Sequence, residues 1–319
     1  MRYKVLLSAP YMIPFADRFV PELEAAGCEV VIPNVNERLE EADLLELVGD
    51  IDGTICGDDR YTRRVIEAAP NLKIISKWGT GIDSIDAAAC HDHGVRIGNT
   101  PNAFTVPVAD SVLAYVLSFA RRTPWMDTHM KAGRWEKIAG RSLSECTIGI
   151  IGVGNIGSAV ARRAAAFGMT ILGTDIRDID VSLITETNMQ VVTKKTLLRE
   201  SDFVTLHCDL NASSHHLMSS AEFALMKETA VLINTSRGPV VDEVALCVAL
   251  AAGRLGGAGL DVFEHEPLPQ SSPLRTMDNV LLAPHNSNSS PRAWERVHQN
   301  SIKNLMLGLR EISRGRRAA

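Results

Sequence analysis

The chain has 319 residues, of which 45% are hydrophobic and 22% are charged, and its formal net charge at pH 7 is -5. Such a mildly acidic chain has no general attraction to nucleic acid or to anionic membranes, and we expect neither as a partner. It contains no run of 18 apolar residues and no signal-peptide pattern, so we expect a cytoplasmic protein whose length favours two domains. The six cysteines lack a CxxC spacing, and the sequence suggests neither a disulfide framework nor a metal site.

The first hundred residues alternate short apolar runs with segments of helical period. This alternation predicts a parallel sheet built from βαβ units. Helices are expected at residues 15–26 and 62–69, the second of which stops before Pro70. The predicted strands are residues 4–7, 29–32, 53–56, 73–76 and 95–97.

A break at Thr100-Pro101-Asn102 separates this region from a long apolar helix predicted at residues 108–121. The last helical segment, residues 291–309, is expected to return to the first domain. We therefore predict an α/β protein with a Rossmann dinucleotide-binding domain at residues 101–286 and a discontinuous, flavodoxin-like substrate domain at residues 1–100 and 287–319. The strands expected in the second domain are residues 147–151, 170–173, 190–192, 203–206, 230–233, 257–260 and 280–282.

A glycine-rich turn follows the first of these strands. Residues 152–157 read GVGNIG and lead into a helix predicted at residues 156–167, which places GxGxxG in its strand–turn–helix context. Glycines there permit a tight turn, a close approach of pyrophosphate to the backbone and close packing of helix on strand, and the helix N-terminus attracts the phosphates. The expected cofactor contacts in this turn are Gly152, Gly154, Asn155, Ile156 and Gly157.

An acidic residue, Asp175, ends the next predicted strand 18 residues after Gly157. A carboxylate at this position binds the ribose hydroxyls of NAD and repels the 2′-phosphate of NADP, so we predict NAD as the cofactor. Arg177, two residues further on, would soften that preference. The alternative is an ordinary glycine turn followed by an exposed acid at a strand end.

Three ionisable residues, Arg237, Glu266 and His285, follow predicted strands in the second half of the chain. Ligands of open α/β sheets bind beyond the carboxyl ends of the strands, so these side chains are candidates for one crevice. A guanidinium can hold a carboxylate and a carbonyl oxygen together, and a histidine can exchange a proton near neutrality. A carboxylate beside the histidine stabilises its protonated form. Taken singly, each residue could equally be a surface ion pair, a structural histidine or part of an acidic loop.

Residues 234–243 (NTSRGPVVDE) and 259–268 (GLDVFEHEPL) resemble signatures of the D-isomer-specific 2-hydroxyacid dehydrogenases. Pro284-His285 and residues 79–83, 99–101 and 133–135 extend the resemblance over nearly the whole chain, and the phosphoglycerate dehydrogenase-like branch is the most similar. The resemblance implies hydride transfer between NAD(H) and a small D-2-hydroxy or 2-oxo acid, such as glyoxylate, hydroxypyruvate or a phosphoglycerate-like acid. It also implies a homodimer, with the helix after Asn102 in the interface.

The resemblance also implies roles for individual residues. Arg237 would bind the substrate carboxylate and carbonyl, and His285 would be the acid and base, with Glu266 as its partner because Glu266 directly precedes the proline of its motif. Residues 79–81 would hold the substrate carboxylate, and Asp261 would lie near the nicotinamide. The full set of implied substrate contacts is Lys77, Trp78, Gly79, Thr80 and Gly81, and the further cofactor contacts are Cys208, Thr235 and Asp261.

Three segments depart from the family pattern. Residues 286–290 (NSNSS) replace a run with glycine and threonine, and residues 207–211 (HCDLN) lack the usual proline. Asp58 and Asp59 stand near the place where phosphoglycerate enzymes have arginines, which is unfavourable for a phosphate, and Arg60 could offset their charge. Trp78 indicates either an apolar pocket wall or interdomain packing. Two other functions stay open: an NAD(H)-sensing protein similar to the corepressors of this fold, and a formate- or phosphite-type dehydrogenase.

Overall fold

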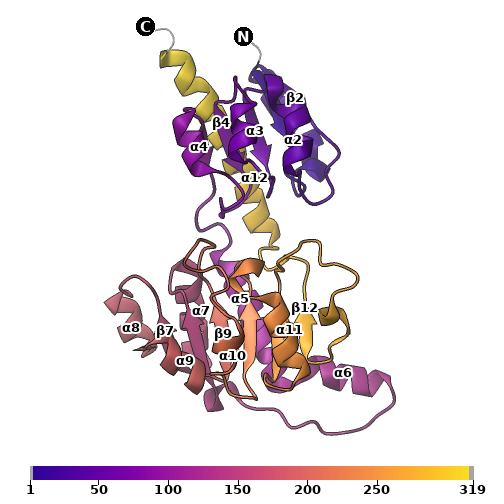
Figure 1. Cartoon of the computed structure of the whole chain (residues 1–319), viewed down its shortest axis with the longest axis vertical. Coiled ribbons are helices and arrows are strands. Elements are labelled where there is room, and N and C mark those ends of the chain that lie inside the picture. The colour runs from indigo at the N-terminus through magenta and orange to yellow at the C-terminus, as the bar shows by residue number, and fades with distance from the viewer. Residues whose placement is uncertain (1–2, 316–319) are drawn as a thin grey trace. The chain divides into compact units, whose positions relative to one another are not determined.

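The computed structural model describes residues 3–315 and divides the chain into two compact units (Figure 1). Unit 1 is formed by the described residues of Met1–Ala103 and Ser290–Ala319, and unit 2 is Phe104–Ser289. The predicted domain boundaries lie at 100/101 and 286/287. The unit boundaries in the structure lie three residues later in each case, at 103/104 and 289/290. Residues 316–319 of the predicted first domain lie outside the described residues.

Unit 1 is built on a five-stranded parallel sheet in the order β2-β1-β3-β4-β5, which is the flavodoxin-like order. The order reverses between β1 and β3, so the loops after these two strands flank the point where such sheets bind ligands. The strands are β1 (Tyr3–Leu7), β2 (Cys28–Val31), β3 (Gly53–Cys56), β4 (Ile74–Lys77) and β5 (Arg96–Gly98). The helices are α1 (Ala16–Ala25), α2 (Glu41–Leu47), α3 (Arg63–Glu67), α4 (Ala87–Asp92) and α12 (Pro291–Gly315).

The last helix, α12, completes unit 1 although almost two hundred residues separate it from the rest of the unit. It packs across β3, β4 and β5, and the Ser76 hydroxyl of β4 donates a hydrogen bond of 2.8 Å to the carbonyl of Ser301. Leu305 and Leu309 are fully buried on this face. Helix α12 therefore belongs to the same compact unit as the first hundred residues.

Two helices are longer than the sequence indicated. Helix α5 (Thr105–Arg121) begins before residue 108, because Pro107 lies in its first turn, where a backbone N–H has no helical acceptor. Helix α12 continues to Gly315, beyond the apolar repeat that ends at Leu309. Five strands have their predicted bounds (β3, β6, β9, β11 and β12), and the ends of the other predicted strands differ by at most one residue.

Unit 2 has a seven-stranded parallel sheet in the order β12-β11-β10-β9-β6-β7-β8, which extends the Rossmann order by one strand. The strands are β6 (Thr147–Ile151), β7 (Thr170–Thr174), β8 (Gln190–Val191), β9 (Phe203–Leu206), β10 (Val231–Asn234), β11 (Gly257–Leu260) and β12 (Val280–Leu282). The helices are α5, α6 (Thr123–Lys131), α7 (Asn155–Ala166), α8 (Val181–Thr187), α9 (Lys194–Glu200), α10 (Ser220–Phe223) and α11 (Glu243–Ala251).

Every residue of β9, β10 and β11 is buried, as expected for parallel strands covered on both faces. Two apolar clusters form the core of unit 2, one of them including Leu246 of α11 and the other Val112 of α5. Along residues 3–315, no helix combines the length and the apolar character needed to cross a membrane.

Candidate functional site

The glycine turn of unit 2 lies between β6 and α7. Gly152 has φ +87°, and a Cβ there would lie 2.7 Å from the carbonyl carbon of His207. A Cβ on Gly157 would lie 2.1 Å from the carbonyl oxygen of Gly152, so both positions require glycine. Around Gly154, in contrast, the nearest atom to a Cβ is Arg177 Nη2 at 3.8 Å. The turn is therefore tight at its ends and open at its middle, where a phosphate can approach the first-turn amides of α7.

Asp175 follows β7 and is directed at this turn. Its carboxylate accepts hydrogen bonds from the amides of Val153 at 2.7 Å and Arg177 at 2.9 Å, and its side chain is 10% exposed. The guanidinium of Arg177 is largely exposed, with Nε 3.8 Å from Asp175 Oδ1. The acid that the sequence assigned to the ribose thus also holds the backbone of the phosphate-binding turn.

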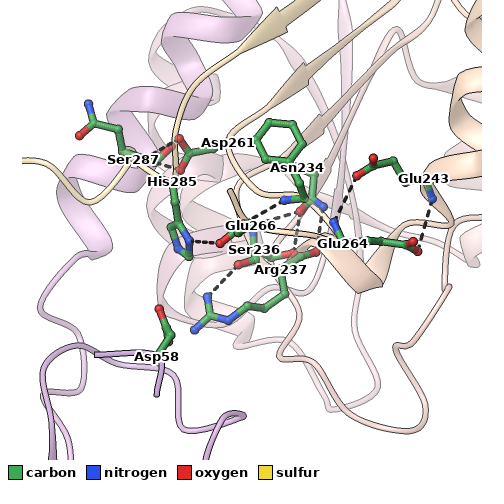
Figure 2. Close-up of polar contacts among 12 residues, drawn as sticks. Asp58, Asn234, Ser236, Arg237, Glu243, Asp261, Glu264, Glu266, His285 and Ser287 are labelled. Atoms are coloured by element: carbon green, nitrogen blue, oxygen red, sulfur yellow. Dashed lines mark hydrogen bonds and ion pairs between the residues drawn. The ribbon is translucent and has the colours of Figure 1, made fainter. Parts of the chain in front are cut away.

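His285 and Glu266 form a hydrogen-bonded pair, with His285 Nδ1 3.0 Å from Glu266 Oε2 (Figure 2). The other carboxylate oxygen of Glu266 accepts a hydrogen bond of 2.9 Å from the amide of Phe263. Both side chains are about one-fifth exposed. With Nδ1 directed at a carboxylate, Nε2 is the ring atom that can exchange a proton with a substrate.

His285 has φ +50°, a conformation that few residues with a side chain adopt. Its amide donates to the carbonyl of Asp261 at 2.8 Å. The Asp261 carboxylate accepts from the amides of Asn286 at 2.7 Å and Ser287 at 2.9 Å, and it is almost completely buried. Asp261 therefore holds the loop that carries the histidine. The sequence predicted only a place near the nicotinamide for Asp261 and did not indicate this second role.

Arg237 lies at the start of a short 3-10 helix, Gly238–Val240. Asn234 fixes this turn: its amide nitrogen donates to the carbonyl of Arg237 at 2.9 Å, and its amide oxygen accepts from the Ser236 amide at 3.0 Å. A Cβ on Gly238 would lie 1.9 Å from the backbone of Phe263, so the turn of Arg237 packs directly on the turn of Glu266. The Asn-x-Ser spacing could have signalled this local turn.

The three ionisable residues follow three neighbouring strands, since β10, β11 and β12 pair in parallel with Asn234 opposite Leu260 and Leu260 opposite Leu282. Neighbouring strands lie about 5 Å apart. Figure 2 shows the guanidinium of Arg237 and the imidazole of His285 extending to the same side of Glu266. The fold of unit 2 thus brings together the residues that the sequence singled out.

Two further predicted cofactor residues lie at the same edge of the sheet. The hydroxyl of Thr235 is buried and has no hydrogen-bond partner among the described residues, so an incoming ligand could supply one. Cys208 follows β9 next to the glycine turn, and burial raises its pKa to about 11, which keeps the thiol protonated at neutral pH. Together with the open glycine turn and Asp175, the buried hydroxyl fits a dinucleotide.

The predicted substrate residues of unit 1 separate into two groups. The Lys77 ammonium is buried and lies 3.1 Å from Asp58 Oδ1. The Trp78 indole is 3% exposed and donates to His298 Nδ1 at 2.9 Å, within a cluster of aromatic rings. Both side chains therefore make internal contacts of unit 1.

Gly79, Thr80 and Gly81 form the second group, a turn after β4. Gly79 has φ +130°, which favours glycine, and Thr80 is exposed. The Thr80 hydroxyl donates to the carbonyl of Thr100 at 3.0 Å, and the side chain of Asn99 donates to the carbonyl of Thr80 at 2.6 Å. These bonds hold the turn in shape, and it is the part of unit 1 that we retain as a candidate carboxylate site.

Comparison with known proteins identifies what this arrangement resembles. The family model for the NAD-binding domain of D-isomer-specific 2-hydroxyacid dehydrogenases matches residues 113–287. Glyoxylate reductase of Thermofilum pendens is 37% identical over 93% of this chain and 91% of its own length. Hydroxypyruvate reductase of Thermotoga maritima is 38% identical over 82% of this chain and 86% of its own length. D-lactate dehydrogenase of Aquifex aeolicus, solved with NAD and lactic acid, superposes with a TM-score of 0.84 over 94% of this chain and 93% of its own, at 27% identity.

Proposed function

Since this chain belongs to the D-isomer-specific 2-hydroxyacid dehydrogenases, which makes it an NAD-dependent oxidoreductase of hydroxy and oxo acids, we propose that it reduces glyoxylate or hydroxypyruvate with NADH. The observation that carries the proposal is the Glu266–His285 pair beside Arg237, at the carboxyl ends of three adjacent strands. Relatives named for these two substrates support the choice of acid.

The proposed catalytic roles follow from the geometry. Arg237 binds the carboxylate and the carbonyl oxygen of the oxo acid through its planar set of donors. When bound, NADH supplies the hydride for C2 of the substrate. His285 donates a proton from Nε2 to the carbonyl oxygen, where negative charge would otherwise build up. Glu266 fixes the ring through Nδ1 and stabilises its positive charge.

The cofactor would be held by the glycine turn and the strand ends around it. The amides of the first turn of α7 suit the pyrophosphate, Asp175 suits the ribose hydroxyls, and Thr235 suits a polar group of the nicotinamide end. Asp175 also disfavours the additional phosphate of NADPH by charge repulsion. We therefore propose NADH as the preferred reductant, with Arg177 leaving some activity with NADPH.

A phosphorylated substrate is less suited to this chain. Lys77, the cation at the end of β4, is already paired with Asp58, so its charge is largely neutralised. Asp59 is buried, where it accepts hydrogen bonds from Ser8 and from the amide of Leu39. Lys77 therefore contributes little net positive charge for a phosphate beside the Gly79–Gly81 turn.

We also propose that the protein is a homodimer. Val106 of α5 is 59% exposed, Met130 of α6 is 51% exposed, and Trp135 in the following loop is 87% exposed. Large apolar side chains concentrated on one stretch of chain favour burial against a partner. Sedimentation equilibrium should give twice the chain mass. The variant Trp135→Ser should lower the association constant of the dimer at least tenfold. A monomeric wild type at micromolar concentration would contradict the proposal.

Six cysteines without a disulfide are consistent with a reducing compartment, and we propose that the protein acts in the cytoplasm.

The substrate proposal is tested by NADH oxidation with a panel of acids: glyoxylate, hydroxypyruvate, pyruvate, phosphohydroxypyruvate and longer 2-oxo acids. We expect kcat/KM for glyoxylate or hydroxypyruvate to exceed that for phosphohydroxypyruvate at least tenfold. His285→Ala should lower kcat by about 10²–10⁴-fold, as expected for loss of a general acid, while NADH affinity measured by fluorescence stays within about twofold. The matched control is His93→Ala, at an exposed position in unit 1.

Two outcomes would decide against the proposal. Undiminished hydride transfer by the His285→Ala variant in stopped-flow experiments would remove the catalytic role of the histidine. Tight NADH binding without turnover of any 2-oxo acid would instead support an NAD(H)-sensing protein.

A further inference from the structure

We propose that Glu264, together with Glu243 and His216, acts as a positioning and charge-setting group behind the Glu266–His285 pair. These three residues, here called the Glu264 cluster, would determine the pH at which His285 takes up the proton that it delivers to the substrate. The inference rests on the proposed role of His285 as the proton donor. None of the three residues touches the reacting atoms in this inference, since they act through Glu266.

The cluster is tied to the turn that carries Glu266. Glu264 lies two residues before Glu266, and its amide donates to Glu243 Oε2 at 3.2 Å. In return, the amide of Glu243 donates to Glu264 Oε1 at 3.5 Å (Figure 2). Glu243 is the first residue of α11, so this reciprocal pair anchors the Glu266 turn to a helix. A displacement of Glu264 would therefore move the carboxylate that orients the histidine.

A third segment supplies the imidazole of His216. Its Nε2 lies 2.6 Å from Glu264 Oε1, and the side chains of His216 and Glu264 are 39% and 23% exposed. The backbone amide of His216 donates to the carbonyl of Pro239 at 2.8 Å, next to the turn of Arg237. The ring also stacks on His215 with centroids 4.1 Å apart. His216 is thus held in place to pair with Glu264, and it carries a positive charge only when protonated.

The carboxylates of Glu243 and Glu264 lie on the side of Glu266 that faces away from His285 (Figure 2). Burial is the largest cause acting on the pKa of Glu243, and it raises that pKa. The hydrogen bond from the Glu264 amide and the charge of His265 lower the pKa, whereas the negative charges of Glu264 and Glu266 raise it. The carboxyl of Glu243 therefore senses the charges of both Glu264 and Glu266. Negative charge in this group stabilises the protonated imidazole of His285, whereas protonated His216 cancels part of that charge.

Other ionisable groups face the cluster from the surrounding elements. Asp242 caps α11, and its pKa is lowered mainly by the amide of Ala245 and to a lesser extent by Ser219 and His216. His265 lies in the Glu266 turn, Arg237 lies in the turn packed on it, and His215 stacks on His216. Because His216 pairs directly with Glu264 and comes from another segment of the chain, replacing it acts on the cluster without altering the Glu266 turn itself.

The test uses two single variants of opposite sign in the full-length enzyme. Glu264→Gln removes a negative charge with little change of shape. The alkaline limb of the pH profile of kcat/KM for reduction should therefore move to lower pH by about half a unit. This shift lowers kcat/KM on that limb about threefold. His216→Asn removes the ring that neutralises part of the Glu264 charge whenever it is protonated, so the limb should move to higher pH, opposite to the shift in Glu264→Gln. In the double variant, His216→Asn should add nothing to the effect of Glu264→Gln.

The matched control is Glu228→Gln, an acid-to-amide change in an exposed ion pair with Arg254 that should leave the profile unchanged. A purely structural brace would lower kcat in both single variants without moving the limb in opposite directions. Equal shifts, or no shifts, in variants that remain folded by circular dichroism would therefore overturn the inference.

A second measurement is independent of turnover. The pKa of the His285 imidazole can be measured by NMR in the enzyme without substrate, with the resonance assigned from its loss in His285→Gln. We expect a lower pKa in Glu264→Gln and a higher one in His216→Asn. If the wild type reduced no 2-oxo acid, the proposed function would fail while these titrations still decided the electrostatic inference. Unchanged pKa values in an enzyme that does reduce oxo acids would reject the inference alone.

Discussion

Glu266 uses both of its carboxylate oxygens, one for the ring of His285 and one for the backbone of Phe263. The second bond fixes the direction of the first, because it closes the turn from which the side chain extends. A glutamine at this position could keep a hydrogen bond to the Phe263 amide through its oxygen and a hydrogen bond to His285 through its nitrogen. It would, however, carry no charge. The orientation and the electrostatic contribution of Glu266 can therefore be separated by substitution.

We predict that Glu266→Gln lowers kcat/KM for oxo acid reduction by roughly 10–100-fold at neutral pH, because the imidazolium loses its carboxylate. The alkaline limb of the profile should move to lower pH by about one unit, while NADH affinity stays unchanged. The comparison is a full pH profile beside that of Glu200→Gln, an exposed acid at the end of α9. An unshifted limb would mean that Glu266 contributes geometry only.

His207, next to the glycine turn, predicts a pH dependence of stability. Burial lowers its pKa from 6.5 to about 3, while its Nε2 lies 3.0 Å from the hydroxyl of Thr205. The unfolded chain takes up this proton near pH 6.5 and the folded chain does not, so stability falls as the pH drops from about 6.5 toward 3. Above pH 6.5 both states are neutral at this residue and the effect disappears.

Because part of the His207 side chain remains accessible to solvent, we expect this residue to account for a loss of about 1 kcal/mol between pH 7.5 and pH 5. His207→Gln should be less sensitive to acid by that amount in urea denaturation. The control is His91→Gln, at an exposed position of α4. Equal acid sensitivity of His207→Gln and the wild type would contradict the prediction.

At the scale of elements, the β6–turn–α7 unit distinguishes two uses of glycine. Gly157 permits the helix to contact the carbonyl of Gly152, whereas Gly154 keeps open space beside the turn. We predict that Gly157→Ala destabilises unit 2 by roughly 2–3 kcal/mol through overpacking and weakens NADH binding. Gly154→Ala should leave the melting temperature unchanged and raise the Kd for NADH about tenfold, because its methyl group occupies the path of the phosphates.

Thermal unfolding and NADH fluorescence of the two variants together test this distinction. A stable Gly157→Ala protein, or a Gly154→Ala protein with wild-type affinity, would show that the turn binds its ligand in another way.

At the scale of the whole molecule, the chain leaves unit 1 at Ala103 and returns to it at Ser290. Unit 2 is continuous and has its own apolar clusters, so we predict that residues 104–289 expressed alone fold and bind NADH. Residues 1–103 alone should not fold, since the face of β4 that α12 covers would be exposed.

Circular dichroism melts of both fragments, with NADH titration of the first, would test this. Residues 1–103 combined with a peptide of residues 290–319 provide the control, since the added helix should restore cooperative unfolding. Failure of residues 104–289 to unfold cooperatively would contradict the independence of unit 2.

The sequence by itself determined the alternation of strands and helices and the glycine turn followed by Asp175. It also singled out Arg237, Glu266 and His285 as candidates, and the family resemblance chose Glu266 over Glu264. These signals are local, since buried parallel strands are continuous apolar runs and a phosphate turn requires glycine at fixed spacings. Helix ends were less predictable, as at the start of α5, where Pro107 is tolerated in a first turn.

Only the tertiary structure decided which distant residues meet. It placed the carboxylate of Asp261 on the loop of His285, the ammonium of Lys77 against Asp58, and the imidazole of His216 against Glu264. The partners in these contacts are 19 to 48 residues apart in the chain, and no periodic pattern relates them. Their pairing depends on strand order and on the packing of neighbouring turns, which the folded chain alone specifies.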